Sequence, residues 1–518
     1  MTPESKPAKV PASRAWVIAA IIFVLGFDIA FLWQRRAGAT SSEFGGDPAE
    51  AAHYVTGLAV QHWLAHDFAG GPQRALTDFA KHYPIVRASA WPPLYPVTQA
   101  AWTSAFGKSR TSALMLMCLL ATIVAVLLYF ALREEFGDAA GIVAAAVFLS
   151  LPLVREQYSL VLPEMLCTAW MLAAALALGR FFERERWSDA LWFGLFAALA
   201  ILTDWAGLAL VLVVPIAVFL SRKTGLLARL PFWSGMILAC ALAGPLAWYF
   251  RVTGWSLLSF DFSREALPFY AARLAVGIGF ILFLFAVPSL IGKILRPAGR
   301  AGHWAVHAAL LAGVVIFVIL APAELEPRRL LPALPTAMMF AAAGCAAVAK
   351  RLGRSAGFVL LIAGVLTIAL LESVVVTWRA KKWSGFQPLA EIVLQAEDHR
   401  NTRVLVCSDR TGEGMFISEI ALAETQPRRF IESAETLFAN TKFSDEEELA
   451  KLIENRGFHY VVFDESNPGL DHSPRHDMLR HLLREGSDRF WEMSASPVIR
   501  DGIAQEASVR LYRVRNSY

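Results

Sequence analysis

The sequence predicts a mostly helical membrane protein of about eleven transmembrane helices, followed by a smaller soluble α/β domain at the C-terminus. Of the 518 residues, 56% are hydrophobic, whereas soluble chains average about 45–50%. Apolar runs of about 18 or more residues recur as far as residue 378, as expected of helices that cross a bilayer. Beyond residue 378, β-rich runs alternate with helical patterns, which is typical of an α/β domain.

The charges and the cysteines exclude two other classes of protein. The formal net charge of +4 forms no basic stripe, so nucleic acid is not expected as a partner. The five cysteines show neither paired nor metal-type spacing, and we therefore expect neither a disulfide framework nor a metal site made of cysteines.

The first apolar run, AWVIAAIIFVLGFDIAFLW, follows Lys6, Lys9 and Arg14. The apolar core of a cleaved signal peptide has about 7–15 residues, and this run is longer. We therefore interpret it as an uncleaved first helix. Residues 1–14 form a polar cytoplasmic tail in this interpretation.

The remaining apolar segments give the membrane topology. The predicted spans are 15–34, 111–132, 138–154, 164–182, 188–203, 205–221, 231–250, 273–292, 303–321, 329–349 and 356–378. The segment PPLYPVTQAAWTSAFG, residues 92–107, is short and rich in prolines, so a re-entrant or surface-lying helix is expected there.

The basic residues support this topology. The loops richest in them contain Arg180, Arg184 and Arg186; Arg222, Lys223 and Arg229; Lys293, Arg296 and Arg300; and Lys350, Arg351 and Arg354. The positive-inside rule places these loops in the cytoplasm. The long loop 35–110, the short loop 154–163 and the C-terminal domain 379–518 then lie on the outer side, after a transmembrane domain of residues 15–378.

The first outer loop contains two carboxylates, in the stretch EFGGDPAEAAHYVTGLAVQHWLAHDF. At 100° per residue, Asp47, Glu50, Tyr54 and Gln61 share one side of a helix. An amphipathic helix on the membrane surface would point this acidic side toward water or a cavity. The alternative is helix-start chemistry, since acidic residues favour the first turn of a helix.

Three further sets of polar residues stand at the outer ends of apolar helices. Glu164 follows Pro163, Asp204 lies between two apolar segments, and Arg328 and Arg329 begin RRLLPALP. Ionisable groups near membrane depth are costly and are functional candidates, although first-turn acids and interfacial anchors explain them as well. Arginine has a planar fork that matches phosphate oxygens. Together these residues suit a site that joins a phosphate-linked lipid to an acceptor.

The order of these features resembles the polytopic glycosyltransferases of the GT-C fold, in particular bacterial relatives of the protein O-mannosyltransferases and the lipid A aminoarabinose transferases. EAAHY at 50–54 is similar to the acidic motif of the first outer loop in that family. WPPLYP at 91–96, LPEM at 162–165 and RRLLPALP at 328–335 are similar to three later motifs. Trp91 stands where many relatives have lysine, and Asp204 stands where a Thr-Lys pair is common, so the donor is left open.

The resemblance implies an inverting enzyme that transfers a hexosyl or pentosyl group from a polyprenyl-phosphate sugar. By that resemblance Glu50 is the base that activates the acceptor, with Asp47 as the alternative, and Glu164 orients the acceptor or helps a bound cation. Arg328 and Arg329 would hold the lipid phosphate. The other expected substrate contacts are Tyr54, Trp91, Tyr95 and Asp204.

The resemblance also implies the setting. The chain would lie in a bacterial cytoplasmic membrane, where it would meet membrane lipid and an acceptor that is a glycan, a lipid or a protein. Some members bind a divalent cation, but no ligand set here is specific enough to assign a metal. The rival interpretations are a transporter or lipid flippase, and a membrane scaffold that presents the C-terminal domain.

Overall fold

The computed structural model describes residues 12–86, 91–252, 263–296, 299–320, 325–374, 382–396, 401–466, 474–486 and 488–515. The chain forms two compact units. The first, here called the helical unit, contains Met1–Trp33, Met117–Tyr158 and Pro163–Thr377. The second, the mixed unit, contains Gln34–Leu116, Ser159–Leu162 and Trp378–Tyr518.

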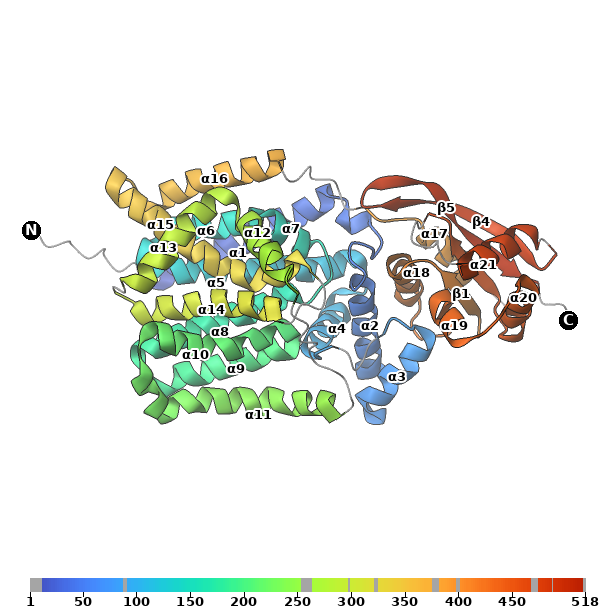
Figure 1. Cartoon of the computed structure of the whole chain (residues 1–518), viewed down its shortest axis with the longest axis horizontal. Helices are drawn as coiled ribbons and strands as arrows, with labels where there is room; N and C mark the ends of the chain where they lie inside the picture. Colours follow the sequence, from blue (N-terminus) through green and yellow to red (C-terminus); the bar gives the residue numbers. More distant parts are fainter. Residues whose placement is uncertain are drawn as a thin grey trace, which may run out of the picture. The chain divides into compact units, whose positions relative to one another are not determined.

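The helical unit consists of apolar helices joined by short connections. Its elements are α1 (Ala12–Arg36), α5 (Arg110–Phe136), α6 (Asp138–Ser150), α7 (Pro152–Tyr158), α8 (Glu164–Arg184), α9 (Trp187–Thr203), η3 (Trp205–Leu208), α10 (Ala209–Ser221), η4 (Thr224–Ala228), α11 (Leu230–Val252), α12 (Ala266–Ile278), α13 (Phe280–Leu295), α14 (Ala301–Leu320), η5 (Pro327–Ala333), α15 (Leu334–Leu352) and α16 (Ala356–Val374). Helices α1 and α5 each begin in one unit and end in the other. Figure 1 shows α8, α9, α10 and α14 side by side.

Among the described residues, six helices are long and apolar enough to cross a membrane, or up to eight if each of two bent helix pairs is one span. Three shorter apolar helices, Trp187–Thr203, Trp205–Ser221 and Leu230–Leu246, complete the set. The apolar segments expected from the sequence are thus helical and the multi-pass helical architecture is confirmed, while the number of spans stays a prediction. Residues 1–11 of the expected tail and 375–378 of the last expected span lie outside the described residues.

One predicted span is sharply bent. The segment expected at 273–292 is divided between α12 and α13, whose axes meet at 108°. Gly279, between them, has φ of +85°, and a Cβ there would lie 1.9 Å from the Thr367 side chain. Only glycine fits both the left-handed backbone and this close approach, so it permits the bend.

The mixed unit combines the long segment between the first two predicted spans with the C-terminal residues. Its elements are η1 (Ala39–Ser41), α2 (Glu50–His66), η2 (Phe68–Gly70), α3 (Pro72–His82), α4 (Leu94–Phe106), α17 (Gln387–Gln395), β1 (Arg403–Cys407), α18 (Arg410–Ala423), β2 (Phe430–Ser433), α19 (Ala434–Asn440), α20 (Glu446–Asn455), β3 (Tyr460–Asp464), α21 (Pro474–Glu485), β4 (Phe490–Arg500) and β5 (Ile503–Val514). The α/β character expected of the C-terminal residues is confirmed.

The strands form a five-stranded mixed sheet in the order β2-β1-β3-β5-β4 within the described residues. Strands β2, β1 and β3 are parallel, and β5 pairs antiparallel with both β3 and β4. Buried side chains of α19, α20 and α21 pack with those of the strands in one core, which includes Phe438, Leu449 and Leu479. Helix α18 packs instead against α2 and α17.

Helix α2 corrects one expectation. Every residue from Glu50 to Val60 is buried, so α2 is not a membrane-surface helix with its acidic side open to water. Helix α4 approaches it so closely that a Cβ at Gly57 would lie 2.4 Å from the Gln99 amide nitrogen. On α18, a Cβ at Gly414 would lie 2.8 Å from the Ala51 Cβ. Neighbouring helices of the same unit therefore enclose the side that was expected to face solvent.

A pH prediction follows from Glu413 on α18. Burial raises the pKa of Glu413 from its ordinary 4.5 to about 7, against a hydrogen bond from Ser433 that lowers it. The folded chain thus binds a proton at this site that the unfolded chain has lost, between about pH 4.5 and 7. The contribution of Glu413 to the free energy of unfolding is fully present below pH 4.5 and is lost as the pH rises through 7.

We therefore expect Glu413→Gln to flatten the fall in apparent melting temperature between pH 4.5 and 8.5. At the alkaline end it should stabilise the protein by up to about 3 kcal/mol, at about 1.4 kcal/mol per pKa unit. Glu506→Gln, an exposed acid on β5, is the control and should leave the slope unchanged. A wild-type slope in Glu413→Gln would contradict the prediction.

Candidate active site

The mixed unit holds Glu50 in a fully buried position at the first turn of α2. Its Oε1 accepts a hydrogen bond from the Val161 backbone N–H at 3.2 Å and forms a salt bridge with Arg110 Nη2 at 3.1 Å. Its Oε2 accepts one from the Gly46 N–H at 3.1 Å. Burial raises the pKa of Glu50, and the charge of Arg110 and the two N–H groups oppose that rise. The carboxylate is thus held by donors on both oxygens.

Arg110 is the cation of this arrangement. It is buried, its Nε donates to the Ala39 carbonyl at 2.8 Å, and its guanidinium lies 4.5 Å from the centre of the Phe44 ring. The sequence reasoning missed it. The available signal was its place as the last basic residue before an apolar helix, next to the loop that carries the acids.

Asp47 lies just before α2 and is half-buried. Its Oδ1 accepts a hydrogen bond from the Ala49 N–H at 2.8 Å, and its carbonyl accepts one from the Glu50 N–H at 3.0 Å. Asp47 therefore shapes the turn that leads into α2, as the helix-start interpretation expects. Part of the Asp47 surface is exposed to solvent, whereas Glu50 has no exposed surface.

The three aromatic residues expected to contact substrate all pack at the first turns of α2. Trp91 stacks on His53 with ring centres 3.8 Å apart, and Tyr95 meets His53 edge-on at 5.8 Å. Tyr54 is fully buried, stacks on Phe44 at 4.1 Å, and donates its hydroxyl hydrogen to the Lys108 carbonyl. His53, one turn after Glu50 in EAAHY, was missed although it was in the quoted motif.

The helical unit contains the second set of expected residues, at the ends of α8 and η5. Arg328 Nε lies 3.2 Å from Glu164 Oε1. Glu326 binds the same guanidinium through both oxygens, at 3.0 Å to Nε and 2.7 Å to Nη2. Arg329 Nε is 3.4 Å from Glu326 Oε2. Glu164 and Glu326 therefore both bind the Arg328 guanidinium directly, and the sequence reasoning had left Glu326 unnamed.

Asp204 belongs to the same unit and begins η3. Its Oδ1 accepts a hydrogen bond from the Ala206 N–H at 2.7 Å, which makes it the N-cap of that short helix. Arg329 and Arg328 are close enough to act on its charge. The acid that replaces a basic residue of the family motif thus lies within the field of two arginines.

Glu43 is a further acid that the sequence reasoning did not assign. Its carboxylate accepts hydrogen bonds from the backbone N–H groups of Gly385, Phe386 and Gln387, between 2.8 and 3.1 Å. These N–H groups open α17, so Glu43 neutralises the positive end of that helix. Glu43 attaches the segment before α2 to the C-terminal residues.

No group of three or more His, Cys, Asp or Glu side chains is arranged to hold a metal ion in the part of the chain that the structure describes. The described residues therefore give no ligand set for the divalent cation that the family resemblance leaves open.

Comparisons with known proteins support the fold. Residues 90–249, less than half of the chain, match the family described as dolichyl-phosphate-mannose-protein mannosyltransferase. A sequence search of curated proteins gave no match. Among solved structures, apo ArnT from Cupriavidus metallidurans is similar over 97% of this chain and 98% of its own, with a TM-score of 0.58 and 14% identity.

Two further structures agree. ArnT from the same organism bound to undecaprenyl phosphate matches 96% of this chain and 98% of its own, with a TM-score of 0.57 and 14% identity. The oligosaccharyltransferase of Archaeoglobus fulgidus, tethered with an acceptor peptide, matches 85% of this chain and 69% of its own, with a TM-score of 0.54 and 13% identity. The chain thus has the GT-C fold that its motifs led us to expect.

Proposed function

We propose that this chain, a multi-pass protein with the GT-C fold, transfers a sugar from a polyprenyl-phosphate donor to an acceptor on the outer side of a bacterial cytoplasmic membrane. The observation that carries the proposal is the contact of Arg328 with Glu164 and Glu326 at the ends of otherwise apolar helices. A guanidinium held in a fixed direction is suited to the phosphate of a membrane lipid. The likeness to a protein crystallised with undecaprenyl phosphate supports the same donor class.

The transfer is a single displacement with inversion at the anomeric carbon. An acceptor hydroxyl forms the new bond, the bond to the lipid phosphate oxygen breaks, and the phosphate leaves with the electron pair. A carboxylate takes the hydroxyl proton, and a cation stabilises the charge on the phosphate. We assign the cation to Arg328, supported by Arg329, and the orientation of the acceptor to Glu164.

We assign the base to Asp47. A base must come within hydrogen-bond reach of the acceptor proton, and Asp47 has exposed surface while Glu50 has none. Glu50 acts as a positioning residue, because its bonds to Gly46 N–H and Val161 N–H hold the turn in which Asp47 lies. Trp91, which stacks on His53 and is half-buried, is proposed to line the sugar path, with the buried Tyr95 and Tyr54 supporting it from within the core.

Arg328→Gln should weaken use of the donor. A hydrogen bond to a charged group contributes about 1.5–3 kcal/mol, so donor kcat/KM should fall about tenfold to a hundredfold. The matched control is Arg273→Gln, an exposed arginine on α12 that contacts Phe269, and its donor kinetics should stay unchanged. Normal donor kinetics in folded Arg328→Gln would mean that Arg328 is a structural anchor and does not bind the donor phosphate.

The function itself is tested with purified protein in vesicles. Polyprenyl-phosphate sugars are screened as donors, and a membrane-impermeant acceptor is added to right-side-out or inverted vesicles. We expect a glycosylated acceptor and free polyprenyl phosphate in the right-side-out vesicles alone. Movement of the intact donor across the bilayer, with no glycosylated product from any donor, would favour a flippase instead.

A further inference from the structure

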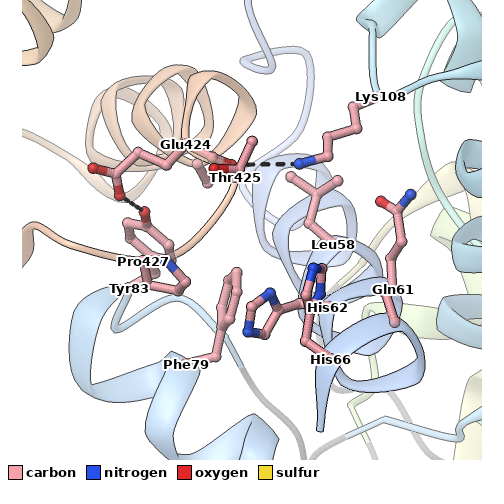
Figure 2. A pocket seen from close by; sticks show the side chains of 12 residues that line it. Leu58, Gln61, His62, His66, Phe79, Tyr83, Lys108, Glu424, Thr425 and Pro427 are labelled. Carbon is pink, nitrogen blue, oxygen red and sulfur yellow. Dashed lines mark hydrogen bonds between the residues drawn. The ribbon is translucent and has the colours of Figure 1, made fainter.

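The mixed unit contains a pocket that the proposed catalytic groups do not use, here called the Lys108 pocket. Its cavity of about 80 Å³ lies between α2, α3, the residues that follow α18, and Lys108. Figure 2 shows His62 and His66 of α2 facing Phe79 and Tyr83, with Lys108 and Glu424 beyond them. A single buried water needs about 10–15 Å³, so this cavity has room for a larger group.

The described lining of the pocket contains one cation, Lys108, and one acid, Glu424, whose charge is compensated by Arg429 outside the lining. Glu424 is its only carboxylate among the described lining residues, and that carboxylate is bound by Arg429, the Tyr83 hydroxyl and the Arg428 N–H. The Lys108 ammonium makes one long hydrogen bond, at 3.4 Å to the Glu424 carbonyl, and forms no salt bridge within the described part of the chain. The Lys108 ammonium has further N–H donors, and the one acid of the cavity is already neutralised. Such an ammonium attracts an anion.

The rest of the lining suits a sugar. The imidazoles of His62 and His66 stack with ring centres 4.8 Å apart, and His62 lies 5.9 Å from Phe79. Burial lowers the pKa of His62, helped by His66 and Lys108, so His62 is neutral at pH 7 and can donate and accept hydrogen bonds. Gln61 adds a buried carbonyl oxygen that has no partner among the described residues.

The pocket is coupled to the Glu50 carboxylate through one short segment. The Lys108 carbonyl accepts the hydrogen bond of Tyr54, and Arg110, two residues later, pairs with Glu50. Along α2, His62 is twelve residues beyond Glu50, or about 18 Å at 1.5 Å per residue. That separation is several sugar units long, so the pocket lies well away from the Glu50 carboxylate.

We propose that the Lys108 pocket is an acceptor subsite that binds an oxyanion carried on a sugar, either a carboxylate or a phosphate monoester. The proposal rests on the transferase function proposed above and deepens it, because it makes the acceptor an acidic saccharide. Lys108 pairs with the oxyanion, His62, His66 and Gln61 bond to hydroxyl groups, and Phe79 packs against the sugar ring.

Isothermal titration of the full chain tests this, in a detergent without sugar head groups. The probes are a glucuronate-terminated trisaccharide, glucose 6-phosphate, inorganic phosphate and maltotriose. We expect one or both acidic sugars to bind at least about tenfold more tightly than maltotriose and phosphate. Preference for the uronate or for the phosphorylated sugar then identifies the source of the anion.

Lys108→Gln should weaken the acidic sugar about tenfold to a hundredfold, because it removes one charge-assisted hydrogen bond. Lys81→Gln, an exposed lysine on α3 of the same unit, should bind as the wild type does. If Lys108→Gln does not fold, His66→Asn replaces it, since His66 is exposed at the end of α2.

Equal affinity for maltotriose, equal affinity for inorganic phosphate, or wild-type binding by folded Lys108→Gln would each overturn the subsite. The outcome is separable from that of the proposed function. Selective binding without transfer from any donor would contradict the proposed transferase function and support the subsite. Transfer without selective binding would contradict the subsite and support the transferase function.

Discussion

Asp47→Asn is expected to lose at least about a hundredfold in transfer rate while the protein stays folded. A positioned general base contributes about 10²–10⁴-fold, and asparagine cannot accept the proton. Its side-chain oxygen can still accept the hydrogen bond from the Ala49 N–H, so the turn before α2 should survive. Initial transfer rates are measured with the active polyprenyl-phosphate sugar, and the melting temperature is recorded for each variant.

The control for this variant is Asp67→Asn, an acid at the other end of α2 that is also half-buried. It should transfer at the wild-type rate. If Asp47→Asn is fully active while a folded Glu50→Gln is inactive, Glu50 is the base and the assignment made above is wrong. If both variants are fully active, Asp47 and Glu50 only stabilise the start of α2 and neither is the base.

Glu50→Gln should destabilise the mixed unit strongly, in spite of the similar shapes of the two side chains. Glutamine offers one acceptor oxygen where Glu50 uses two, and its amide nitrogen would face an N–H donor. The change also leaves Arg110 buried without its carboxylate. Removing one partner of a buried ion pair costs about 3–5 kcal/mol.

A double-mutant cycle measures this contact. Arg110→Met alone should also be destabilising, and the Glu50→Gln/Arg110→Met double variant should lose less than the sum of the two, by about 0.5–3 kcal/mol. The exposed pair Arg489 and Glu447 is the reference, and its cycle should show little coupling. Additive effects at Glu50 and Arg110 would mean that their ion pair contributes nothing to the stability.

Some residues of the candidate site could be predicted from the sequence and others could not. Glu164 and Arg328 were selected as separate motifs, far apart in the chain, and the structure places their charged atoms 3.2 Å apart. Their charges and their places at the ends of apolar helices marked them as functional candidates, because ionisable groups near membrane depth are costly, but the contact between them was not predicted. Glu326 was overlooked, although it stands two residues before Arg328, since acids beside two arginines give no distinct pattern.

The exposure of α2 could not be predicted in the same way. The helical periodicity placed Asp47, Glu50 and Tyr54 on one side, and an acidic side normally faces water. Burial of that side depends on Arg110 and on helices α4 and α18, which come from distant parts of the chain. A charge is buried only where a partner compensates it, and periodicity carries no information about a partner elsewhere in the sequence.

The sequence by itself determined the membrane-embedded helical class, the apolar segments, the α/β character after residue 378 and the GT-C resemblance. These follow from local composition and periodicity, because each segment must satisfy its own backbone and match its own surroundings. Only the tertiary structure decided which acid is enclosed and which stays accessible, that Glu43 joins the segment before α2 to the C-terminal residues, and that Lys108 lines a pocket with two histidines. The physical reason is that burial, pairing and cavity shape arise between segments distant in sequence, so no single segment encodes them.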